Sequence, residues 1–129
     1  MEIVITGKPI AKKRPRFFRR GPFVGAYNAQ ETEEGRWKVE AKGQITAPID
    51  GPVSADMLFI MPKPKGLSRK KADALLHHVK KPDLDNLVKF AKDCLNGLAW
   101  RDDSQVCKLI ALKIYGDFPK TIIKLEGAR

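Results

Sequence analysis

The sequence predicts an α+β domain in which two main helices pack on a mixed β-sheet of about four strands. Two observations indicate this class: several segments alternate apolar and polar residues, and others carry apolar residues at three- and four-residue spacing. The 129 residues, 43% of them hydrophobic, suffice for one modest core and leave no room for a second catalytic domain. Residues 1–129 are therefore expected to form a single domain, with a basic N-terminal arm at about residues 8–27.

Four segments are predicted to be strands. Residues 2–6 alternate apolar residues with charged or β-branched ones up to a Gly and Pro break. Residues 52–61 alternate throughout and are expected to form a central strand, buried on one face and partly on the other. Residues 106–115 and 121–126 form two further strands, and the five residues between them have the length of a β-hairpin connection.

Two further segments are predicted to be helical on weaker patterns. Residues 28–45 carry apolar residues at four-residue spacing, and the largest of these, Trp37, is expected to pack in the core. After a Pro-rich break, Ser68 is expected to cap a short basic helix that continues through Leu76. The region around this short helix is the most linker-like in the chain.

The strongest pattern runs from Leu84 to about Asn96. Asp83 stands at the N-cap position, and Asn96-Gly97 supplies the left-handed residue that ends a helix. An apolar stripe along this segment predicts one face buried in the core. The stripe comprises Leu84, Leu87, Val88, Ala91, Cys94, Leu95 and Leu98.

The N-terminal arm has no acidic residue between Ile3 and Gln30. Its aromatic residues are Phe17, Phe18, Phe23 and Tyr27. Pro and Gly interrupt the arm, so a mobile arm or hairpin is expected rather than a core element. Basic side chains neutralise phosphates and aromatic rings stack on unpaired bases, which favours nucleic-acid contact over a merely solvated loop. The expected DNA contacts are Lys12, Lys13, Arg14, Arg16, Arg19 and Arg20.

The overall charge points to the same class of partner. A formal net charge of +10 and a pI near 9.8 favour a polyanion, with nucleic acid first. The sequence has no apolar run near 18 residues and no secretory signal pattern at its start, so no membrane span and a cytoplasmic location are expected. Cys94 and Cys107 form no CxxC pair and are expected to be reduced and buried, without zinc.

Three acidic positions are predicted to converge. Asp83 and Asp85 begin the strongest helix, while Asp102 and Asp103 stand just before a strand that packs back on it. Neighbouring carboxylates raise one another's pKa unless a cation lies among them, and ligand sets made only of oxygen suit Mg²⁺ or Mn²⁺. Lys89 lies one turn beyond Asp85, where it could neutralise the cluster or hold a phosphate oxygen or attacking water. The adjacent His77 and His78 are not expected to take part.

These residues resemble the RusA family of Holliday-junction resolvases. The resemblance rests on the run Asp83-Leu84-Asp85-Asn86-Leu87 and on Lys89, Asp93, Leu95 and residues 100–106, with weaker support from residues 12–16. It implies that Asp83, Asp85 and Asp103 are catalytic metal ligands and that Lys89 is also required. It further implies a small, homodimeric, Mg²⁺-dependent endonuclease, with Mn²⁺ able to substitute. Such enzymes act on branched DNA in recombination and repair, and phages or prophages often encode them.

Several alternatives remain open at this point. Asp102 is expected to support the site through hydrogen bonds, and Asn86 to orient a ligand or contact the backbone. A purely structural interpretation has Asp83 cap the helix, Asp85 pair with Lys89, and Asp102-Asp103 form a turn. In another class, the protein is a non-catalytic basic DNA-binding module, although carboxylates beside its basic surface would repel phosphate. A third possibility is a metal nuclease that acts on other branched nucleic acid.

A homodimer is expected because resolving a four-way junction needs two cuts at symmetry-related positions, and one aspartate cluster makes only one. The strands at 106–115 and 121–126 are apolar enough to pair across a twofold axis.

Overall fold

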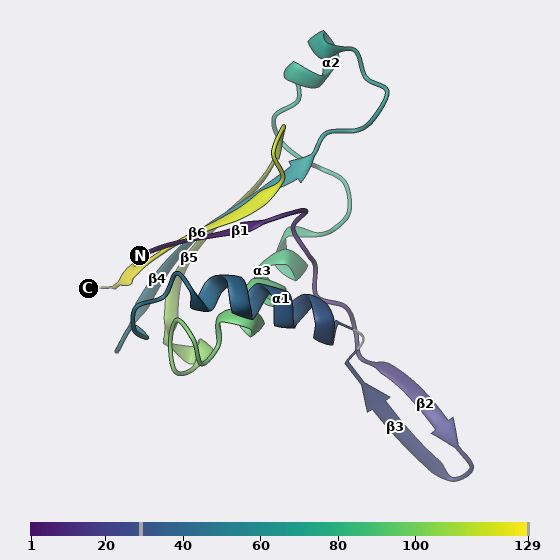
Figure 1. The fold of residues 1–129 in the computed structure, drawn as a ribbon, viewed down its shortest axis with the longest axis vertical. Coiled ribbons are helices and arrows are strands. Elements are labelled where there is room, and N and C mark those ends of the chain that lie inside the picture. Colours follow the sequence, from purple (N-terminus) through teal and green to yellow (C-terminus); the bar gives the residue numbers. More distant parts are fainter. Residues whose placement is uncertain (29, 129) are drawn as a thin grey trace.

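The computed structural model describes residues 1–28 and 30–128, and it confirms the predicted α+β class (Figure 1). A four-stranded sheet has the order β1-β6-β4-β5. Its strands are β1 (Glu2–Thr6), β4 (Val53–Pro62), β5 (Val106–Gly116) and β6 (Lys120–Gly127). β4 pairs parallel with β5 and antiparallel with β6, so the sheet is mixed and β4 is central, as predicted.

The two long helices lie on the same side of this sheet (Figure 1). They are α1 (Glu31–Lys42) and α3 (Leu84–Leu95). β4 alternates as expected, and its buried residues from Val53 to Met61 face these helices. Trp37 of α1 is buried and meets the ring of Phe90 edge-on, with the ring centroids 5.2 Å apart. Trp37 is thus a core residue, as predicted.

Both helices differ in detail from the prediction. α1 is shorter than residues 28–45, since it begins at Glu31 and ends at Lys42, and within it only Trp37 and Ala41 are buried. In α3, Phe90 is buried in addition to most of the predicted stripe, whereas Leu84 and Leu98 at the two ends of the stripe are half-buried. Packing of an apolar face supplies most of the stability of a helix. The short apolar face of α1 stabilises only a short helix, whereas the broad apolar face of α3 is buried nearly from end to end.

The predicted hairpin between β5 and β6 is wrong. Each of these strands pairs with β4, on opposite sides, and residues 117–119 cross over the end of β4. The crossing brings Gly116 against β4, where a Cβ atom would overlap the Cγ2 atom of Ile60. Of the two strands named for a dimer axis, β6 is hydrogen-bonded along both edges, so β5 alone keeps an edge, part of which pairs with Leu76 and His78. Residues 121–126 therefore have no free edge for strand pairing across such an axis.

Two segments project from this core (Figure 1). One is an antiparallel hairpin of β2 (Arg16–Arg20) and β3 (Phe23–Tyr27), so the basic arm takes its hairpin form. Gly21 opens the hairpin loop with φ +56°, a conformation that favours glycine.

The other projecting segment lies between β4 and α3 and contains the short helix α2 (Arg69–Asp73). Ser68 caps α2 as predicted, and its Oγ atom accepts a hydrogen bond from the Lys71 N–H at 3.3 Å. α2 ends before Leu76 because Leu76 instead pairs with β5, where its carbonyl accepts a hydrogen bond from the Tyr115 N–H.

The two cysteines lie in different environments. Cys94 is buried as predicted, and desolvation raises the pKa of its thiol to about 12. Cys107 is exposed, contrary to the prediction, because it lies at the start of the edge strand β5. Among the described residues, no helix is both long and apolar enough to cross a membrane.

Candidate active site

A shallow hollow of about 320 Å³ lies beside α3. Its lining residues are Asp85, Val88, Lys89, Lys92, Asp93 and Asp103. The α3 residues recur at three- and four-residue spacing, so they share a face of the helix, and core packing of the other face fixes their direction. Asp103 comes from a short 3-10 helix, Asp103–Gln105, that leads into β5. The fold therefore places Asp85, Lys89 and Asp103 around one hollow.

Asp103 is held by the core through Trp100. The Trp100 Nε1–H donates a hydrogen bond to Asp103 Oδ1 at 2.9 Å, and Trp100 is fully buried. In the described part of the chain, the other carboxylate oxygen of Asp103 accepts no hydrogen bond. Asp103 thus presents one fixed oxygen and one available oxygen at the hollow. Sequence reasoning missed this role of Trp100, although its position three residues before Asp103 was a usable signal.

Asp102 forms hydrogen bonds within the turn instead of facing the hollow. Its Oδ2 atom accepts a hydrogen bond from the Ser104 N–H at 3.0 Å, and the Asp102 N–H donates to Gln105 Oε1 at 3.0 Å. Hydrogen bonds from the side chain and backbone of Ser104 lower the pKa of Asp102. The side chain of Gln105 also donates to the carbonyls of Ile49 and Gly51. Asp102 therefore shapes the turn that presents Asp103 and does not itself line the hollow.

Asp83 does not join the hollow. It is the N-cap residue of α3, as predicted, but its side chain makes no capping hydrogen bond. Both of its carboxylate oxygens instead accept hydrogen bonds from Lys81 Nζ, at 3.0 and 3.2 Å. Over the described ranges, no group of three or more His, Cys, Asp or Glu side chains is arranged to hold a metal ion. The predicted convergence of three carboxylates is therefore not preformed.

The backbone before Asp83 is nevertheless fixed. Lys113 Nζ donates hydrogen bonds to the carbonyl oxygens of Lys80 and Pro82, each at 2.7 Å. The Asp83 side chain is 51% exposed, and its ion pair with Lys81 lies at the surface, where such pairs contribute little stability. The position of Asp83 is thus set by the fold, while its carboxylate is free to change partner.

Asp85 and Lys89 stand apart from the ion pairs and side-chain hydrogen bonds formed among the described residues. Both are exposed, and within the described part of the chain neither forms an ion pair or a side-chain hydrogen bond. The structural alternative of an Asp85–Lys89 pair is therefore absent. By contrast, the neighbouring Asp93 pairs with Lys12 at 3.0 Å. A carboxylate and an ammonium without partners beside one hollow are available to a ligand.

The base of the arm is tied to this helix. Lys12 Nζ contacts Asp93 and also Glu34 of α1 at 3.2 Å, and the Lys12 N–H donates to the Asn86 carbonyl at 2.9 Å. Burial opposes the charge of Lys12, but hydrogen bonds to Asp93 and Glu34 outweigh it and raise its pKa. Lys12 was expected to contact DNA, but its ammonium is committed to these carboxylates. Asn86 acts here through its backbone carbonyl.

A buried amide forms a second anchor that sequence reasoning missed. Gln30 is 1% exposed, its Nε2–H donates to the Ala11 carbonyl at 2.7 Å, and its Oε1 atom accepts from the Lys13 N–H at 2.7 Å. The remaining expected DNA contacts lie beyond this anchor and are exposed, namely Lys13, Arg14, Arg16, Arg19 and Arg20. The side chain of Tyr27, also named for the arm, lies outside the described residues.

Comparison with known proteins decides the class. The family model "Endodeoxyribonuclease RusA" matches residues 6–126, nearly the whole chain. The chain belongs to the RusA endodeoxyribonuclease family. A relative in Bacillus subtilis (strain 168), the uncharacterized protein YqaN, is 34% identical over 135 residues, which cover 98% of this chain and 95% of the relative.

RusA-family proteins are endodeoxyribonucleases that resolve Holliday junctions, and they depend on metal in general. The predicted enzyme class is confirmed, and the alternative of a non-catalytic DNA-binding module is set aside.

Proposed function

We propose that this RusA-family protein resolves four-way DNA junctions during recombination and repair by paired symmetric nicks, as a Mg²⁺-dependent homodimer. The observation that carries the proposal is the hollow beside α3, where the available Asp85, Lys89 and Asp103 meet. They lie on a domain with net charge +10, which suits a polyanionic substrate.

The donor chemistry fits a hard divalent cation. Among the residues that the structure describes, Asp85 and Asp103 have no cationic partner, so their carboxylate oxygens are available. Asp83 stands two residues before Asp85 in a weak surface pair. We infer that these three residues hold Mg²⁺, for which Mn²⁺ can substitute, because all-oxygen ligand sets suit these ions. When bound, the cation would withdraw charge from the scissile phosphate and lower the pKa of an attacking water.

The side chains around the cation site position the substrate. Lys89 extends its ammonium at the hollow, where it would hold a non-bridging phosphate oxygen or the attacking water. Trp100 keeps one Asp103 oxygen in place, which leaves the other for the cation. Asp102 maintains the turn below them, and the Asn86 side chain, one residue after Asp85, is assigned to orienting a ligand.

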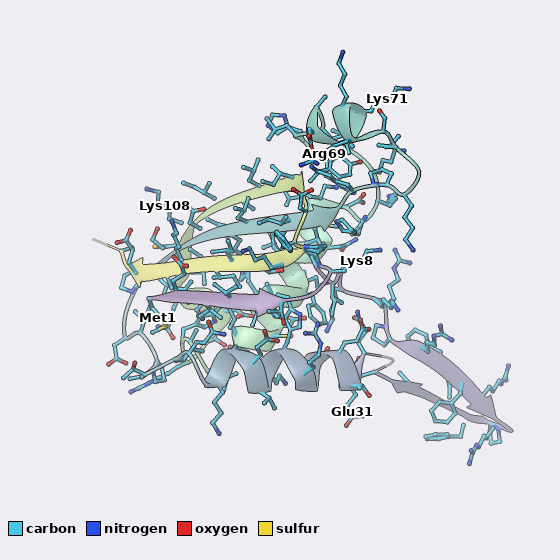
Figure 2. The ribbon with its side chains drawn as sticks, turned by 45° about the horizontal axis from the view of Figure 1, so that its top comes forward. Met1, Lys8, Glu31, Arg69, Lys71 and Lys108 are labelled. Carbon is cyan, nitrogen blue, oxygen red and sulfur yellow. The ribbon has the colours of Figure 1, made fainter. Side chains whose placement is uncertain are left out.

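Basic side chains on both projecting segments would hold the arms of the junction. Lys13, Arg14, Arg16, Arg19 and Arg20 are exposed along the hairpin. The segment between β4 and α3 adds a second basic group that leads directly into Asp83. That group comprises Lys65, Arg69, Lys70, Lys71, Lys80 and Lys81. Figure 2 shows Arg69 and Lys71 on the projecting α2, at a distance from the hairpin.

The uncovered face of the sheet supports a homodimer. Strand register aligns Val4, Ile122, Leu58 and Leu112 in one apolar row across all four strands, on the face away from α1 and α3. Leu112 is 45% exposed, and Ile110 beside it is 54% exposed. Apolar surface of this kind marks interfaces, and a twofold dimer would supply two identical sites for two cuts.

A cruciform plasmid tests the proposal. In Mg²⁺, the dimer is expected to convert the supercoiled cruciform directly into linear product, since both strands are cut within one complex, while linear duplex stays intact. Sedimentation of the same protein should give twice the chain mass, and Leu112→Lys should reduce it to a monomer that only nicks. A wild-type monomer, or nicked circles that never become linear, would contradict paired resolution.

A further inference from the structure

The β2–β3 hairpin exposes large aromatic side chains that do not pack in any core. Phe17 is 75% exposed and Phe23 60% exposed, and none of the described side chains in either strand is buried. The hairpin projects from the sheet and helices (Figure 1). Two-stranded hairpins without a core are marginally stable, and exposed aromatic residues on such a segment indicate a binding partner.

We propose that this hairpin is a base-stacking wedge, in which Phe17 and Phe23 stack on bases at the opened centre of a DNA junction. The inference rests on the proposed function and deepens it, because it names the feature of branched DNA that the hairpin recognises. The charge of the hairpin selects nucleic acid as the occupant. Arg16, Arg19 and Arg20 accompany the rings, and the chain has no acidic residue from Ile3 to Gln30.

The register of the hairpin gives each face one prominent ring. The pairs Phe17↔Ala26 and Arg19↔Val24 point to one face, whereas Arg20↔Phe23 points to the other. Phe17 and Phe23 therefore stand on opposite faces, about 10 Å apart along the ribbon at roughly 3.4 Å per residue. A ribbon with a ring on each face can enter between two helical stacks and contact a base on either side, which a flat surface cannot do.

Phe18 supports the ring at the tip. Its ring lies 6.0 Å from that of Phe23, at 52° between the planes, and the Arg20 guanidinium lies over it at 5.9 Å. Gly25 leaves room for this packing, since a Cβ atom there would overlap the Phe18 ring. The Phe18 contacts thus hold Phe23 and Arg20 together, as a stacking ring beside a cation for the neighbouring phosphate.

The wedge is fixed relative to the active site. Lys12, at the base of the hairpin, pairs with Asp93, which itself lines the hollow that contains Asp85 and Lys89. Insertion of the hairpin at the branch point would therefore place the hollow at a set distance from that point. Linear duplex offers no unstacked bases and would receive only the phosphate contacts, so the rings would discriminate branched from linear DNA.

The test places 2-aminopurine in a four-way junction, either beside the crossover or far along one arm, without divalent metal so that no cleavage occurs. Wild-type protein is expected to change the fluorescence at the crossover and leave the distal probe unchanged. The double variant Phe17→Ala/Phe23→Ala should lose that change and bind the junction roughly tenfold or more weakly. Its affinity for linear duplex should stay within about twofold of wild type, since its arginines remain.

Matched variants separate stacking from other causes. Phe118→Ala removes a ring that is 79% exposed in the connection between β5 and β6, and it should behave as wild type. Phe17→Trp/Phe23→Trp should keep the fluorescence change, whereas the leucine pair should lose it. Two results would overturn the wedge while leaving resolution intact. One is an equal loss of affinity for junction and linear duplex in the alanine pair, and the other is a wild-type fluorescence change and junction affinity in the leucine pair. A shift of the alanine pair to monomer in sedimentation would instead make the hairpin a protein contact. Absence of junction preference in the wild type would contradict the proposed function itself.

Discussion

The helix that carries Asp85 and Lys89 and the hairpin that carries Arg16, Arg19 and Arg20 are stabilised in opposite ways. α3 buries six residues against the sheet and α1, so its exposed face has a fixed direction. The hairpin buries none of its described side chains, and its base is attached to the core through Gln30 and Lys12. Groups proposed for chemistry therefore lie on elements packed into the core, and groups proposed for recognition lie on a segment that projects from it. Substitutions in the two regions should consequently have separable effects.

Loss of a proposed metal ligand should have the largest effect. Asp85→Asn and Asp103→Asn, and equally Asp83→Asn, are expected to reduce junction cleavage below detection, because an amide is a poor ligand for a hard cation. Junction binding should stay the same or tighten, since a charge that repels phosphate is removed. Cleavage gels and gel shifts on the same preparations measure both.

Asp102→Asn is the matched control, because asparagine caps a turn as well as aspartate does. It should leave cleavage near the wild-type rate. Loss of cleavage in Asp102→Asn together with its retention in Asp103→Asn would exchange the roles of the two residues.

Lys89→Ala should also lose most cleavage, with almost no change in stability. Lys89 is exposed and has no ion-pair partner in the described part of the chain. The substitution therefore does not remove even the 0.3–0.5 kcal/mol or so of stability that a helix-surface ion pair typically contributes. Single-turnover rates and thermal melts separate the two quantities. A melting temperature several degrees lower, with full activity restored on cooling, would make Lys89 a structural residue.

Trp100→Phe should reduce the cleavage rate by about 10- to 100-fold, the range for groups that orient metal ligands. It removes the N–H that binds Asp103 and keeps an aromatic ring in the core. Trp37→Phe is the matched control, since Trp37 is equally buried but its Nε1 has no hydrogen-bond partner among the described residues. Comparable destabilisation of both variants, with loss of rate only in Trp100→Phe, is expected. Equal rates in the two would remove Trp100 from the site.

The smallest effects are expected in the arm, and they should appear in binding. Replacing Arg14, Arg16, Arg19 and Arg20 by glutamine should lower the slope of log affinity against log salt by about 0.9 for each phosphate that is no longer neutralised.

Lys12→Ala should behave differently because its ammonium already pairs with Glu34 and Asp93. The variant should lose about 1 kcal/mol of unfolding free energy, which lowers the melting temperature by a few degrees. The slope of log affinity against log salt should change little. A slope that falls by about one full unit in Lys12→Ala would return Lys12 to the DNA surface.

Local sequence pattern was sufficient for the elements and for part of the site. The apolar stripe of α3 and the alternation of β4 follow directly from periodicity, and helical spacing placed Asp85 and Lys89 on one face. Strand order was not predictable in this way, since a short connection fits both a hairpin and a crossing over β4. The pairing of β5 and β6 with opposite edges of β4 shows that the crossing occurs.

The remaining differences come from contacts between residues distant in sequence. Lys12 has the composition of a phosphate contact, and only the folded chain shows it beside Asp93 and Glu34. Asp103 differs from Asp102 through its hydrogen bond to the buried Trp100, while Asp102 caps a turn. Periodicity reports the direction of a side chain relative to its own element, but it does not report which partner meets the side chain there.

One paired measurement tests the division of roles most directly: the junction dissociation constant and the single-turnover cleavage rate at saturating protein, for Asp103→Asn and for the four-arginine variant. Asp103→Asn should keep wild-type affinity and lose the rate. The arginine variant should lose affinity, steeply with salt, and keep the wild-type rate once the junction is saturated. Loss of both affinity and rate in each variant would contradict the separation of chemistry at the hollow beside α3 from recognition by the hairpin.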